Sequence, residues 1–258
     1  MEDFLIFNLD PFWQIAILLF LMFIALYVGT IVSKWEKWIE SKSQGGSSIL
    51  ISAMFGLSAF LLAFTFSMSA NRYDARRQII VEEANDIGTA ILRSDLYIDS
   101  VRNIFRAEFK NYVEIRIAYF EAGMDKNAIR RSLKAAEISS SKIWHLASEQ
   151  SKIPSNLAAS IQMIPAVNAM IDIVTTRYIG FLAKVPVSIV IMLYLISIAC
   201  AFFAGVALNR IDWLTSAGFC LLTVMVIYIT LDLDSPRKGF IQLTTSHRAM
   251  YDLRNMFK

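Results

Sequence analysis

The chain alternates between long apolar stretches and one long polar stretch. Four apolar segments contain no Asp, Glu, Lys, Arg or His: Phe12–Val32, Ile49–Ala70, Val185–Asn209 and Trp213–Leu231. A helix rises about 1.5 Å per residue, so roughly 20 residues cross a hydrocarbon core about 30 Å thick. The pattern therefore predicts four membrane-spanning helices.

The polar stretch, Asn71–Lys184, separates the second span from the third and carries 29 of the chain's 47 charged residues. Its apolar positions recur at helical spacing, beginning with Ile80, Ala84, Ile87 and Ile91. This spacing predicts helices whose apolar stripe is buried against other helices.

Glycine and proline divide the polar stretch. Gly88 is a plausible bend in the first helix, and the sequence around Gly123 predicts a turn before a second helix that ends near Gln150. Pro154 opens a third segment, in which Pro165 indicates a break or a fresh helix start.

These elements predict an all-α membrane protein with a cytoplasmic helical bundle inserted between the second and third spans. The expected divisions are a first transmembrane pair (1–70), a helical domain (71–184), a second transmembrane pair (185–231) and a C-terminal segment (232–258).

Basic residues near the span ends predict the orientation, because loops rich in Lys and Arg stay cytoplasmic. Four lie on one side: Lys34, Lys37, Lys42 and Arg210. Ten lie on the side of the polar stretch: Arg72, Arg76, Arg77, Arg177, Lys184, Arg237, Lys238, Arg248, Arg254 and Lys258. The polar stretch and both termini are thus expected in the cytoplasm, in a multi-pass protein of the plasma membrane.

Composition agrees with a membrane protein and excludes several functions. The chain is 56% hydrophobic and 18% charged, whereas soluble domains are about 45–50% apolar and about 25% charged. A net charge of +3 is too small to indicate nucleic-acid binding. His145 and His247 stand alone, and Cys200 and Cys220 lie within apolar spans. We therefore expect no enzyme activity, cofactor or metal site.

The second span carries the most informative pattern. Small residues fall on one helix face at steps of three or four: Ser52, Gly56, Ala59, Ala63 and Ser67. Such a face allows close contact with another span. Gly56, Phe60 and Phe64 follow each other at steps of four. Rings of these side chains from several subunits would instead form a dry constriction, which is a way that channels close.

Two motifs carry a resemblance to a known family. The segment from Phe60 to Phe64, followed by Arg72-Tyr73 and Ala75-Arg76, resembles the second transmembrane segment of the bestrophin ion channels. Together with the segment from Leu231 to Gly239, it resembles more specifically the bacterial bestrophin-like proteins of unknown function. The resemblance extends over the four-span layout.

The resemblance implies a homo-oligomeric channel, a pentamer, that conducts small ions passively across the bacterial inner membrane. The second span would line the pore, with Phe60 and Phe64 at the hydrophobic neck and Gly56 at the outermost neck position. Family members usually have a bulky residue there, so glycine would leave that ring wide.

A polar cluster is expected at the cytoplasmic ends of the spans. Asp232, Asp234 and Arg237 follow the fourth span, and Arg72 and Arg76 follow the second. The cluster is either a structural helix-end pairing or a brace for the pore exit. Two carboxylates are too few for calcium, which takes six to eight oxygen ligands.

A membrane-anchored interaction or signalling protein is the alternative function. Its cytoplasmic helices would bind a partner, while the spans would serve only for dimerisation. The size of the polar stretch and the possible extension of the second span into it favour this alternative.

Overall fold

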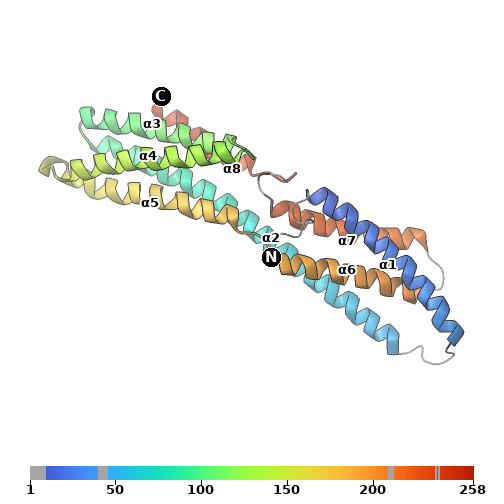
Figure 1. Cartoon of the computed structure of the whole chain (residues 1–258). Coiled ribbons are helices and arrows are strands. Elements are labelled where there is room, and N and C mark those ends of the chain that lie inside the picture. The colour runs from blue at the N-terminus through green and yellow to red at the C-terminus, as the bar shows by residue number, and fades with distance from the viewer. Residues whose placement is uncertain (1–9, 40–45, 209–211, 236, 238) are drawn as a thin grey trace. The chain divides into compact units, whose positions relative to one another are not determined.

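The computed structural model describes residues 10–39, 46–208, 212–235, 237 and 239–258, and these contain helices but no strand (Figure 1). Three basic residues used to predict the orientation, Lys42, Arg210 and Lys238, lie outside this set. The chain forms two compact units. We call residues 1–71 with 184–235 the membrane unit, and residues 72–183 with 236–258 the polar unit.

The membrane unit contains the four apolar helices that the sequence predicts. They are α1 (Pro11–Ile39), the first part of α2 (Gly46–Arg93), α6 (Val187–Ala207) and α7 (Trp213–Leu233). Among the described residues, four helices are long enough and apolar enough to cross a membrane, in agreement with the predicted number of spans.

Helices α1 and α6 touch backbone to backbone at a pair of glycines. A Cβ atom placed on Gly29 would lie 2.1 Å from the carbonyl oxygen of Phe202, and one placed on Gly205 would lie 2.1 Å from that of Leu26. Because only glycine fits at either position, the contact is as close as two helices allow. It anchors α1, which also packs against α7.

The polar unit begins with the second part of α2. It continues with α3 (Asp99–Glu121), α4 (Lys126–Ser151), α5 (Leu157–Leu182) and α8 (Thr244–Asp252), and short 3-10 turns η2 (Ser94–Leu96), η3 (Pro154–Asn156) and η4 (Leu253–Phe257) join or end them. The predicted apolar stripe of Ile80, Ala84, Ile87 and Ile91 is fully buried. From Ala84 onward it packs on aromatic residues of α3, including Phe105 and Phe109.

The turn between α3 and α4 forms where the sequence predicts it. Gly123 adopts a left-handed conformation with φ of 51°, which glycine tolerates at little cost. Asp125 then caps α4, since its Oδ1 accepts hydrogen bonds from the backbone N–H groups of Asn127 and Ala128 at 2.8 and 3.1 Å.

Neither predicted interruption ends a helix. Helix α2 is one continuous helix of 48 residues through Gly88, so the second span extends into the polar stretch, as the sequence allowed. Pro165 lies inside α5 rather than at a break. Proline has no backbone N–H, so within the helix the carbonyl of Ile161, four residues earlier, loses its usual donor.

Candidate functional site

The predicted neck residues lie on an exposed face of α2. Phe60 is 66% exposed and Phe64 is 54% exposed, and their rings lie nearly parallel with centroids 6.3 Å apart. A Cβ atom on Gly56 would meet no other atom within 4 Å. These three residues, which we call the neck face, therefore line one side of the helix without being covered by the chain itself.

The small-residue face of α2 is exposed as well. Ser52, Gly56, Ala59, Ala63 and Ser67 are all exposed. The prediction that this face packs against another span is therefore wrong within one chain.

The side of α2 that the chain covers carries different residues. Ser58, Thr65 and Ser69 are buried there, and the Thr65 hydroxyl donates to the carbonyl of Leu61 at 2.7 Å. Only 11% of the most apolar part of α2 is buried in the chain, against 28 to 33% in the other spans. Of the four spans, α2 therefore has the smallest share of its surface covered by its own chain.

The arginines of the predicted polar cluster lie in the polar unit. Arg76 is buried and donates from Nε to the carbonyl of Gly180 at 3.0 Å, and also to that of Ala183. These bonds satisfy the last carbonyls of α5. Arg237 donates to the carbonyl of Gly123 at 2.6 Å. Arg72 is half-buried on α2.

The aspartates of that cluster lie in the membrane unit. Both are buried, and Oδ2 of Asp234 accepts a hydrogen bond from the backbone N–H of Val185 at 2.5 Å. Asp234 therefore joins the end of α7 to the residues that precede α6. Pairing between these aspartates and the arginines stays a prediction.

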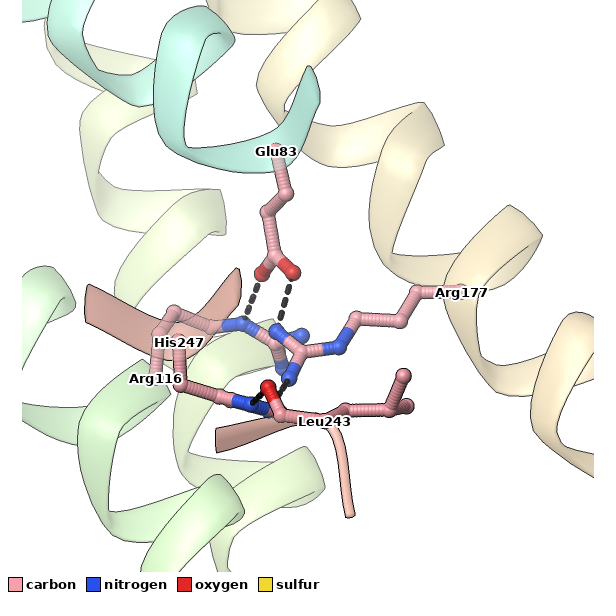
Figure 2. Close-up of polar contacts among 5 residues, drawn as sticks. All are labelled: Glu83, Arg116, Arg177, Leu243 and His247. Atoms are coloured by element: carbon pink, nitrogen blue, oxygen red, sulfur yellow. Dashed lines mark hydrogen bonds and ion pairs between the residues drawn. The ribbon is translucent and has the colours of Figure 1, made fainter. Parts of the chain in front are cut away.

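A buried ion cluster in the polar unit was not foreseen from the sequence. Glu83 of α2 accepts from Nε of Arg116 of α3 at 2.5 Å, and its other carboxylate oxygen accepts from Nη1 of Arg177 of α5 (Figure 2). All three side chains are at most 2% exposed. Burial by itself would raise the pKa of Glu83, but the charges and hydrogen bonds of both arginines outweigh burial and lower that pKa below its ordinary value.

His247 of α8 completes the buried ion cluster. Its Nε2 lies 3.1 Å from Nη2 of Arg177, and its Nδ1 lies 2.6 Å from the carbonyl oxygen of Leu243 (Figure 2). Arg177 can only donate, so Nε2 accepts and the proton is on Nδ1. Burial, with the charge of Arg177, lowers the pKa of His247 from 6.5 to about 4, although the bond to Leu243 opposes that shift. The imidazole is therefore neutral near pH 7.

The sequence does contain a signal for this cluster. Glu83 lies between Ile80 and Ile87 on the buried stripe of α2, and Arg116 lies directly before the buried Ile117. Charged residues on an apolar stripe are rare unless they are paired. Which residues pair could not be predicted, since Glu83 and Arg177 are 94 positions apart.

In the part of the chain that the structure describes, the protein is all-helical and has four helices long and apolar enough to span a membrane. The chain matches the family model of the Bestrophin-like domain over residues 40–247, and it belongs to that family. This confirms the resemblance that the α2 motif indicated. No curated protein matches the chain by sequence.

The fold is similar to that of a solved structure. A mutant of a bacterial bestrophin homolog from Klebsiella pneumoniae superposes with a TM-score of 0.70 at 13% identity. The match covers 97% of this chain and 99% of the other, so the likeness extends over the whole fold.

Proposed function

We propose that the chain is one subunit of a homo-oligomeric ion channel, a pentamer, in which α2 lines an axial pore. The exposed neck face of α2 is the observation that carries this proposal, and membership of the Bestrophin-like family supports it. In the bacterial inner membrane, residues 71–184 and 232–258 and both termini would be cytoplasmic.

The neck face suits a hydrophobic gate. In a ring of subunits, Phe60 and Phe64 would form two apolar rings about one helical turn apart. A narrow apolar passage expels water, and ions then face a barrier because they lose hydration without gaining a partner. Gly56 would leave a wider vestibule beside these rings. The phenylalanines therefore set the conductance.

Replacement of both phenylalanines by alanine tests the gate. We expect the Phe60→Ala, Phe64→Ala double variant to conduct more current than the wild type in planar bilayers, because the constriction widens. Phe66→Ala is the matched control, since residue 66 lies about 200° around the helix from residue 64 and is also exposed. Unchanged current in a well-assembled double variant would contradict the neck assignment.

Subunit counting tests the assembly independently of conduction. Mass photometry in mild detergent should give a particle of five chains of 29.2 kDa each. A ring has a central axis that α2 can line, whereas a dimer encloses no such pore. A dimer would overturn the channel proposal and favour the membrane-anchored interaction protein.

A further inference from the structure

A cavity of about 240 Å³ lies beside the buried ion cluster in the polar unit. Its walls come from the end of α3, the turn at Gly123, α5, the segment that precedes α8, and α8 itself. Pockets for drug-sized ligands are about 300–1,000 Å³, so this cavity suits a smaller molecule.

Two arginines line this cavity and share the same aromatic supports. The guanidinium carbon of Arg177 lies 5.2 Å from the ring centre of Tyr119, and that of Arg237 lies 4.8 Å from the same centre. Both also lie within 6 Å of the ring centre of Phe181, at 5.8 and 5.4 Å. Ring faces attract cations, but they do not cancel the repulsion between two like charges held together.

The donors of Arg177 are only partly used. Nη1 binds Glu83 and Nη2 binds His247, but Nε is buried and has no hydrogen-bond partner among the described residues. Nη1 and Nη2 of Arg116 are also buried and also have no hydrogen-bond partner among the described residues. A buried donor without an acceptor costs free energy, and more so when it carries a charge.

The charges around the cavity do not balance. Arg177 and Arg237 line the cavity as cations and His247 is neutral, while Glu83, the buried carboxylate next to Arg177, is shared with a third cation, Arg116. Glu121 also lines the cavity, but it is exposed at the rim, where its carboxylate accepts from the Tyr251 hydroxyl at 2.9 Å. The interior of the cavity therefore favours an anion.

We propose that this cavity binds a small oxyanion, a phosphate or carboxylate group, between Arg177 and Arg237. Guanidinium groups match such anions because their N–H donors form a planar fork. The donors of Arg237 that do not bind Gly123 are available to it, and the charge of Arg177 attracts it from the adjoining wall. The bound anion joins α5 to the segment before α8. This proposal does not depend on ion conduction.

Calorimetric titration of the full-length protein with inorganic phosphate tests the proposal. The titration is done in mild detergent at pH 7.5 and constant ionic strength, with chloride as the reference anion. Arg237→Gln should weaken binding about tenfold or more, because a charge-assisted contact is lost. Arg237 is preferred to Arg177 as the test position, since Arg177 also holds Glu83. Arg131→Gln, an exposed change on α4 of equal charge, should bind like the wild type.

A second arm distinguishes free anions from a lipid headgroup. The wild type and Arg237→Gln are placed in nanodiscs that contain phosphatidic acid or only phosphatidylcholine, and their melting temperatures are compared. If phosphatidic acid raises the melting temperature of the wild type but not of Arg237→Gln, and free phosphate does not bind, then the anion in this cavity is a lipid headgroup. Equal behaviour of Arg237→Gln and the wild type in both arms, or no binding in either arm, would overturn the proposal.

Discussion

The two units of this protein are held together in different ways. In the membrane unit, α1 and α6 meet at Gly29 and Gly205, and buried hydroxyls such as Thr65 donate to carbonyls of their own helix. In the polar unit, large aromatic residues form the core and Glu83 joins three helices through ion pairs. In lipid there is no hydrophobic drive between helices, so close shape complementarity decides which helices associate. In water the hydrophobic effect drives the burial of apolar side chains, and a charge can be buried with them if it is paired.

Loss of Glu83 should be the most damaging single change, and it should act on the polar unit. Glu83→Ala leaves two buried guanidinium groups without their carboxylate, which typically costs about 3–5 kcal/mol. We expect faster amide hydrogen exchange in α3 and α5, measured by mass spectrometry. Glu82→Ala is the matched control, because Glu82 is the adjacent residue and is exposed. If both variants exchange alike, the buried ion cluster does not hold the polar unit together.

Acid should weaken the polar unit through His247. The folded protein keeps this imidazole neutral down to about pH 4, while an unfolded chain binds a proton near pH 6.5. Between those values the unfolded state binds more protons, so stability is full above about pH 6.5 and falls as the pH decreases toward 4. The full loss is roughly 3 kcal/mol.

Melting temperatures of the wild type and His247→Gln between pH 4 and 7.5 measure this effect. Other groups titrate in that range, but they are common to both proteins. The variant should therefore lose less stability than the wild type on acidification. Parallel curves would show that His247 titrates in the folded state as it does in the unfolded chain.

Substitution of Gly29 should damage the membrane unit instead. Gly29→Ala places a methyl group against the Phe202 carbonyl, and overpacking of this kind costs roughly 1–3 kcal/mol. Cys200 and Cys220 are the chain's cysteines, and both are buried in this unit. A thiol-reactive dye should therefore label the heated variant at a lower temperature than the wild type. Gly218→Ala, with no atom within 4 Å of a new Cβ, should leave that temperature unchanged.

Substitution of Gly56 should have the smallest effect on stability but a clear effect on function. A Cβ there meets no other atom of the chain within 4 Å, so Gly56→Leu should melt like the wild type. In the proposed pore it adds a third apolar ring and should lower the current in planar bilayers. Gly218→Leu, at an equally open position on α7, should leave the current unchanged. Equal currents in Gly56→Leu and the wild type would place Gly56 outside the pore.

The spans were predictable because their signal is local. A charge-free stretch of about 20 residues has few structures available other than a spanning helix. The apolar stripe from Ile80 to Ile91 was predictable for a similar reason, since helical spacing is visible within a short window.

What could not be predicted depends on distant parts of the chain. The sequence leaves open whether α2 bends at Gly88, and it gives no sign that Leu253 and Met256, far along the chain, lie next to this glycine. The pairing of Glu83 with Arg177 and the position of His247 beside Arg177 depend on how α2, α5 and α8 pack. The motif on α2 was sufficient to indicate the family, whereas nothing near His247 in the sequence revealed its partners.

The contact between Gly29 and Gly205 also limits how this family member can change over time. Each glycine faces a main-chain carbonyl of the opposite helix rather than a side chain. A larger residue at one position therefore cannot be accommodated by a smaller residue at the other, because the obstacle is an atom that every amino acid has. Relief would require the two helices to separate along their length. A second substitution, which can rescue many core mutations, therefore cannot rescue a larger residue at either of these two positions.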